Sequence, residues 1–130
     1  MNLFKVLCMT SLCLMTTPSF AEDAPEAAPE AFQASVERGK HTFDTVCIHC
    51  HHATSEVSTV GCPGLLGVLS RHDAAWLDSW LASPESFSKT NVKAKSVVAA
   101  NPYGLVMPSL PEMQHEHDRL DVIEFLKTLK

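Results

Sequence analysis

Two cysteines, Cys47 and Cys50, stand three residues apart, and His51 follows the second one directly. This C-x-x-C-H spacing is the attachment pattern for c-type haem. On a helical turn, positions i, i+3 and i+4 share a face, so both thiols and the imidazole can address the same flat ring. We therefore predict one covalently bound haem c, with thioethers at Cys47 and Cys50 and with His51 as the proximal iron ligand.

Two other chemistries use a C-x-x-C pair, namely a zinc site and a thioredoxin-like dithiol. A zinc finger needs a second ligand pair at a suitable spacing, and the chain supplies none. A thioredoxin-like fold needs strands alternating with helices, and no segment shows a convincing strand pattern. The haem interpretation is favoured, and the intact mass of the processed protein separates it from the dithiol.

The N-terminus has the layout of a secretory signal peptide, with a basic residue before an apolar run and a small-x-small cleavage site. The apolar run extends from Val6 to Leu14, and the cleavage site is Ser19-Phe20-Ala21. This run is too short for a permanent membrane span. We predict a signal peptide over residues 1–21 and export to the periplasm. Cleavage would remove Cys8 and Cys13.

The segment after the signal peptide is small, acidic and punctuated by proline. Residues 22–33 are therefore predicted to form a flexible Pro/Ala leader, and residues 34–130 to form one domain. Cys62 is the remaining cysteine outside the motif. A lone thiol in an oxidising compartment can form an intermolecular disulfide or react, whereas a buried one behaves as an inert apolar residue. We expect Cys62 to be buried and to react slowly with thiol reagents.

The chain holds 10 Lys plus Arg against 15 Asp plus Glu, a net charge of −5. Residues 1–21 contain Lys5 as their only charged side chain, so cleavage would lower the net charge to −6. An acidic chain of this kind is not expected to bind nucleic acid. Lys89, Lys93 and Lys95 would form a basic rim for a partner, or would only keep a loop solvated.

Apolar residues at steps of three and four, from Phe32 to Val46, predict an amphipathic helix that leads into the motif. Gly39 lies inside it at a cost of about 1 kcal/mol relative to alanine, which indicates that another backbone approaches closely there. A loop is predicted over residues 53–67. It would be followed by a helix from about Ser70, with an S-x-x-D cap, that ends before Pro84.

The remaining sequence has one strong helical segment. Residues 116–129 carry a broad apolar face and predict the last helix. Residues 85–103 are polar with a weak apolar cluster, and we expect a long loop there with at most one helical turn. Such long loops are unusual in a small domain unless they wrap a prosthetic group that becomes part of the core.

The order of these features resembles that of the class I monohaem cytochromes c over nearly all of residues 35–129. Gly39 and Phe43 precede the motif at the spacing G-x-x-x-F-x-x-x-C-x-x-C-H. The run from Pro63 to Gly67 is similar to the family's G-P-x-L-x-G loop, although a cysteine stands where its first glycine is usual. Met107-Pro108 resembles the loop that supplies the sixth iron ligand.

The resemblance implies an all-α cytochrome c fold, with three main helices and long loops around one haem. It implies His51 and Met107 as axial ligands. It also implies that the Pro63 carbonyl accepts a hydrogen bond from His51, and that Phe125 packs where the first and last helices cross near Gly39. Alternatives for the sixth ligand remain in Met113, His115 and His117.

The resemblance further implies a single-electron carrier rather than an enzyme, because iron with six ligands leaves no open site for a substrate. Redox proteins would donate and accept the electrons during brief docking, which depends on complementary surfaces. Two alternatives stay open. One is the haem c subunit of a larger periplasmic oxidoreductase, and the other is a haem protein that binds a gas or reacts with peroxide.

Overall fold

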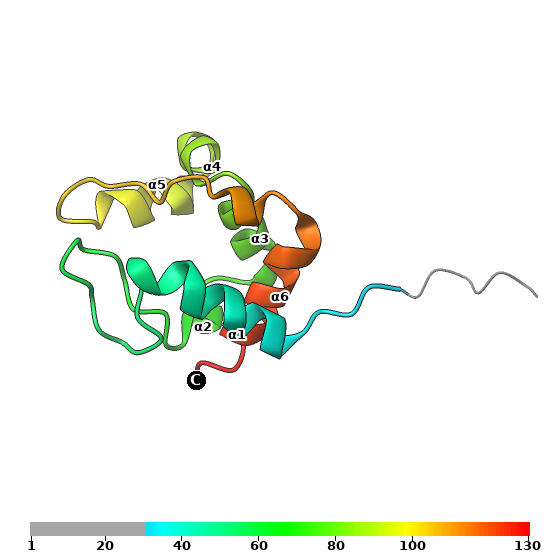
Figure 1. Cartoon of the computed structure of the whole chain (residues 1–130). Helices are drawn as coiled ribbons and strands as arrows, with labels where there is room; N and C mark the ends of the chain where they lie inside the picture. The colour runs from blue at the N-terminus through cyan, green and yellow to red at the C-terminus, as the bar shows by residue number, and fades with distance from the viewer. Residues whose placement is uncertain (1–30) are drawn as a thin grey trace, which may run out of the picture. The chain divides into compact units, whose positions relative to one another are not determined.

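The computed structural model describes residues 31–130, which form six α-helices and two 3₁₀ helices and contain no strand (Figure 1). The all-α prediction is therefore confirmed. The predicted signal peptide and residues 22–30 of the predicted leader lie outside the described residues. The elements in chain order are α1 (Val36–Thr45), η1 (Cys47–His49), α2 (Val68–Arg71), α3 (Ala74–Ala82), α4 (Pro84–Thr90), α5 (Val92–Ala99), η2 (Pro111–Met113) and α6 (Glu116–Leu126).

Helix α1 begins at Val36, four residues after the predicted start at Phe32. The Ser35 side chain caps the helix by accepting a hydrogen bond from the Arg38 backbone N–H at 3.3 Å. Phe32 lies before the helix, and its ring stacks on His117 of α6 with the centroids 3.8 Å apart. Its apolar character therefore serves a contact with the last helix rather than the face of α1.

Helices α1 and α6 cross at Gly39, as the sequence predicts. A Cβ atom at this position would lie 1.9 Å from the Asp121 carbonyl oxygen and 3.0 Å from the Phe125 Cβ. One turn further along α1, the rings of Phe43 and Phe125 pack with their centroids 5.2 Å apart. The missing side chain thus allows the two backbones to touch, which explains why the helix tolerates a glycine.

The capping pattern predicted for the next helix is wrong in its details. Ser70 belongs to α2, and its hydroxyl donates to the Gly67 carbonyl at 2.7 Å. The extended residue His72 ends α2, and Asp73 then caps α3 by accepting from the Trp76 backbone N–H at 2.8 Å. The predicted single helix is therefore two helices, because a residue with extended backbone cannot continue either one.

The predicted loop over residues 85–103 is also wrong, because α4 and α5 occupy most of it. Pro84 occupies the first turn of α4, where its lack of an N–H costs nothing. Asn91 caps α5 by accepting from the Ala94 backbone N–H at 3.0 Å, and it also accepts from the Trp76 indole N–H at 3.3 Å. Each helix has only about two turns, so neither carries enough residues for a clear apolar period.

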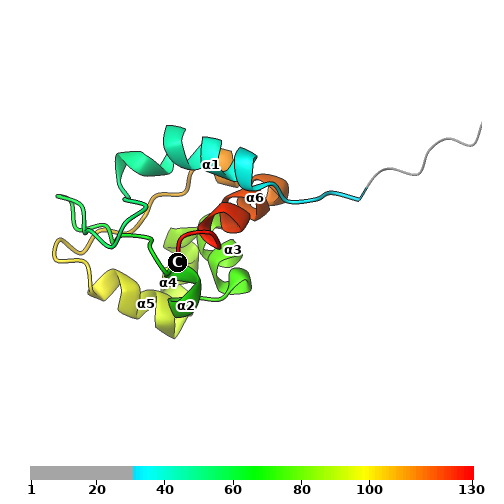
Figure 2. The same ribbon diagram turned by 90° about the horizontal axis from the view of Figure 1, so that it is seen from below.

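The core of the described chain joins residues from α1, α2, α3, η2 and α6. Helix α6 supplies four of its members but ends at Leu126, three residues before the predicted end. In both views α1 and α5 lie on opposite sides of the molecule (Figure 2). The buried cluster consists of Phe43, Val68, Leu77, Leu81, Met113, Val122, Ile123, Phe125 and Leu126.

Candidate haem-binding site

The C-x-x-C-H motif forms a single tight turn directly after α1. The backbone N–H groups of Cys50 and His51 both donate to the Cys47 carbonyl, at 3.1 and 2.8 Å. Cys47 packs against the core, and burial raises the pKa of its thiol to about 11. Cys50 is exposed, and both cysteines are free thiols. The turn therefore brings together the three side chains that the motif assigns to haem attachment.

His51 is oriented by the loop that follows it. Its Nδ1 lies 2.8 Å from the Pro63 carbonyl oxygen, which matches the hydrogen bond that the resemblance implies. Because a carbonyl oxygen can only accept, Nδ1 carries the proton and Nε2 keeps its lone pair. Burial lowers the pKa of His51, although the bond to Pro63 opposes this shift. The imidazole is thus presented neutral, which is the form that ligates a metal.

The Pro63 loop is held by contacts that the sequence alone does not reveal. A Cβ atom at Gly64 would lie 2.3 Å from the Thr54 carbonyl oxygen, so only glycine fits there. The Arg71 guanidinium in α2 donates to the carbonyls of Gly64 and Leu66, at 2.9 and 3.0 Å. Arg71 therefore acts as a positioning residue for the carbonyl that orients the histidine. The sequence does not reveal this role of Arg71, because the two backbone carbonyls carry no side-chain signal.

The candidates for the sixth ligand have different surroundings. Met107 is half-buried in the segment after α5 and packs against the edge of the core. Met113 in η2 is fully buried, with 0% exposure, among core side chains. His115 occupies the N-cap position of α6 without a side-chain capping bond, His117 lies in the first turn, and both are exposed. Of these four residues, only Met107 is half-buried at the edge of the core. Cys47 packs against the same core.

Cys62 is half-buried rather than fully buried, so the expected position is not confirmed. Burial raises the pKa of its thiol, and the Ser58 side chain opposes that shift. The neighbouring Cys50 raises the pKa further. The cysteine that replaces the family's usual glycine thus lies beside the attachment motif.

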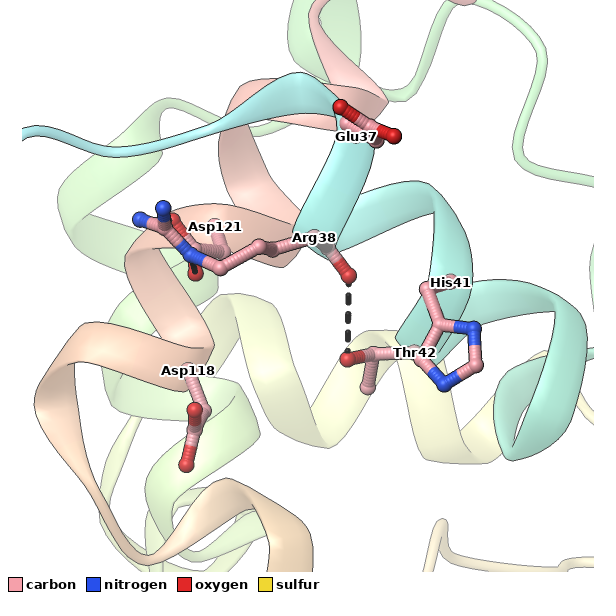
Figure 3. Close-up of a pocket in the computed structure, with 6 residues that line it drawn as sticks. All are labelled: Glu37, Arg38, His41, Thr42, Asp118 and Asp121. Carbon is pink, nitrogen blue, oxygen red and sulfur yellow. Dashed lines mark hydrogen bonds and ion pairs between the residues drawn. The ribbon is translucent and has the colours of Figure 1, made fainter.

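A shallow pocket lies away from the motif, between α1 and α6 (Figure 3). There the Arg38 guanidinium donates to the Asp121 carboxylate at 2.6 and 2.8 Å, beside the helix crossing. No group of three His, Cys, Asp or Glu side chains within residues 31–130 is arranged to hold a metal ion. The pocket is therefore part of the helix interface. Its lining residues are Glu37, Arg38, His41, Thr42, Asp118 and Asp121.

An all-helical fold, a C-x-x-C-H turn and a histidine oriented by a proline carbonyl together define a c-type haem protein. Comparison with known proteins agrees, because residues 36–130 match the family model "Cytochrome c". The chain belongs to this family, and it is 32% identical over 106 residues to cytochrome c2 from Rhodopila globiformis. That alignment covers 71% of this chain and 91% of the relative. No solved structure gives a significant match.

Membership in this family implies a covalently attached haem c, and the described residues fit that group. Two unpaired thiols and an imidazole with a free Nε2 stand on one turn, which is the donor set that haem c requires. The chain is therefore a c-type cytochrome, a class of electron-transfer haem proteins with redox partners. No helix within residues 31–130 is long and apolar enough to cross a membrane.

Proposed function

We propose that this protein carries single electrons between redox proteins in the periplasm, with one haem attached at Cys47 and Cys50 and ligated by His51 and Met107. The observation that carries the proposal is the 2.8 Å contact between His51 Nδ1 and the Pro63 carbonyl. It leaves Nε2 free for iron and fixes the ring in one orientation. The signal-peptide layout of residues 1–21 supports the location.

The assignment of Met107 rests on burial and chemistry. A thioether is a soft ligand that raises the reduction potential of haem iron, as a carrier with a six-coordinate metal needs. Met107 is only half-buried and is free of the tight packing around Met113, which is fully enclosed by the core. Moving Met113 to a metal would leave a cavity in that core.

The bound haem supplies an iron that changes between the ferrous and ferric states. The protein residues keep this change confined to electron transfer. The Pro63 carbonyl holds the Nδ1 proton of His51, which increases the electron donation from Nε2. The buried side chains beside Cys47 exclude water from one side of the site. A sixth ligand from Met107 leaves no position for a substrate.

Optical spectroscopy of the haem-loaded protein tests the ligand set. We expect Met107→Ala to keep haem attached but to lose the sulfur-to-iron charge-transfer band. Met113→Leu is the matched control and should keep the band, because leucine is similar in size to methionine and Met107 stays in place as the ligand. Loss of the band in Met113→Leu with retention in Met107→Ala would move the sixth ligand to Met113.

Carbon monoxide added to the ferrous protein separates the carrier from a gas-binding protein. A six-coordinate carrier should bind it slowly or negligibly, and Met107→Ala should bind it rapidly. Rapid, high-affinity binding by the unmodified protein would contradict the carrier proposal. Mass analysis of the processed chain adds an independent check, since haem attachment and a free dithiol differ in intact mass.

A second candidate is the haem c subunit of a larger periplasmic oxidoreductase complex. It is favoured by exposed apolar side chains on and after α5, with Val92 at 78%, Tyr103 at 65% and Leu105 at 51% exposure. Lys93 offers little to a partner, because its ammonium donates to the Arg71 carbonyl. Size-exclusion chromatography of the natively isolated protein discriminates, since a free carrier elutes alone.

A further inference from the structure

One side chain links the two stretches of chain on which the proposed axial ligands depend. The proximal loop, residues 57–67, contains the Pro63 carbonyl that orients the histidine ligand. The distal segment, residues 100–110, follows α5 and contains Met107. These two stretches lie at the same end of the described chain in both views (Figure 1 and Figure 2), and Asn101 joins them.

Asn101 uses both halves of its side-chain amide. The oxygen Oδ1 accepts from the backbone N–H groups of Tyr103 at 2.8 Å and Leu105 at 3.2 Å. The nitrogen Nδ2 donates to the carbonyl of Gly61 at 3.0 Å and to that of Val60 at 3.4 Å. The oxygen therefore shapes the distal segment, and the nitrogen fastens that segment to the proximal loop.

The junction between the two stretches is close as well as polar. Gly61 has a φ of +77°, and a Cβ atom there would lie 2.8 Å from the Pro102 Cδ and 3.0 Å from the Asn101 Nδ2. Any side chain at residue 61 would push the proximal loop and the distal segment apart. The glycine thus allows the approach that the asparagine bond requires.

The distal segment has little other support around Met107. Among the described residues, positions 105–109 make no backbone–backbone hydrogen bond. Asn101 holds the chain before the methionine, and the Ser109 hydroxyl holds the chain after it by donating to the Glu85 carboxylate in α4. Met107 therefore lies between two side-chain anchors, and the first of them also binds the proximal loop.

We propose that Asn101 is a positioning residue for the sixth iron ligand, because it ties the segment that carries Met107 to the loop that orients His51. The inference rests on the proposed ligation by Met107. A segment held by few hydrogen bonds opens locally at a low free-energy cost. Loss of the bonds from Nδ2 would make this opening more frequent, and the sixth position would be free for longer.

Carbon monoxide binding to the ferrous, haem-loaded protein measures this opening, because the gas competes with Met107 for the sixth position. Asn101→Ala removes all of the side-chain bonds, whereas Asn101→Asp keeps the acceptor for the two N–H groups and loses only the donor. We expect both variants to bind carbon monoxide roughly five- to tenfold faster, as the net loss of about one hydrogen bond would cause. A rate in Asn101→Asp equal to that of the unmodified protein would overturn the proposal.

Gly39→Ala is the matched control, because its added Cβ would meet the Asp121 backbone at the helix crossing and not the proximal loop or the distal segment. This variant should be less stable and should bind carbon monoxide at the unmodified rate. An equal acceleration in Gly39→Ala would show that the rate follows overall stability, which would overturn a positioning role. Gly61→Ala disturbs the junction from the other side and should also bind carbon monoxide faster.

Amide hydrogen exchange gives a readout that does not depend on which residue is the sixth ligand. In the haem-loaded protein, the N–H groups of Tyr103 and Leu105 should be protected in the unmodified chain and should lose that protection in Asn101→Ala. Rapid exchange of both groups in the unmodified protein would show that the bonds to Oδ1 do not persist, and the proposal would fall.

The sulfur-to-iron band separates this proposal from the assignment on which it rests. If Met107→Ala loses the band, Met107 is the ligand, and unchanged carbon monoxide rates in both Asn101 variants would then overturn the positioning role alone. Retention of the band in Met107→Ala would overturn the ligand assignment and the positioning role together.

Discussion

Replacing Gly39 by alanine should destabilise the protein by forcing α1 and α6 apart. The added Cβ would lie 1.9 Å from the Asp121 carbonyl oxygen and 2.4 Å from its carbon. An ordinary contact begins near 3.4 Å, so the helices would have to separate by about 1.5 Å. Both atoms belong to the backbone of a helix and cannot rotate away.

The expected magnitude follows from two opposing effects. Overpacking a core typically costs about 1–3 kcal/mol, and a rigid backbone obstacle favours the upper end. Alanine regains about 1 kcal/mol of helix propensity relative to glycine. The net loss should be about 2 kcal/mol, which lowers the melting temperature of a domain of this size by roughly 8–16 °C.

Thermal and urea unfolding of the haem-loaded protein, followed by far-ultraviolet circular dichroism, measure this change. The matched control is His41→Ala on the exposed part of the same helix, which should stay within about 0.5 kcal/mol of the unmodified protein. The haem spectrum should be unchanged in both, since neither residue belongs to the attachment turn. A Gly39→Ala variant as stable as the unmodified protein would refute the reasoning about the helix crossing.

Two further substitutions test polar contacts that hold the helices. Asp121 is buried, which by itself raises its pKa, but bonds from Arg38 and the Ser35 N–H lower the pKa below its ordinary 3.8. The carboxylate therefore stabilises the folded state above about pH 4, and this contribution is lost as the pH falls through the lowered pKa. Asp121→Asn should lower the free energy of unfolding by about 1–3 kcal/mol at pH 6 and by much less in acid. Urea unfolding at several pH values measures this difference. A difference that does not change with pH would contradict the reasoning. Asn91→Ala should cost about 1–2 kcal/mol by removing the α5 cap, whereas Asn91→Asp, which keeps an acceptor, should unfold near the unmodified urea midpoint.

The parts predicted correctly from the sequence are local or repeat at short spacing. The haem turn depends on residues within five positions of one another, and α1 and α6 are long enough to show an apolar period. The close approach at Gly39 was also predicted, because a glycine inside a helix has a cost that needs a reason. The hydrogen bond from His51 to Pro63 came from the family's motif spacing and not from periodicity.

The parts that were missed involve short elements or partners distant in the chain. Helices α4 and α5 have seven and eight residues, and each is stabilised by packing and caps more than by its own pattern. Arg71 binds backbone carbonyls, which are the same for every residue type and so leave no trace in the sequence.

By itself, the amino-acid sequence determined that this chain is helical, that it carries one haem-attachment turn and that it belongs among c-type cytochromes. The tertiary structure decided which methionine is buried in the core and which lies at its edge. It also decided that the loop that contains Cys62 lies beside the attachment turn, where the Pro63 carbonyl bonds the His51 ring. Eleven residues lie between Cys50 and Cys62, so only the folding of the intervening loop brings the two segments side by side. Such contacts depend on packing between segments, and the residue spacing within one segment does not predict that packing.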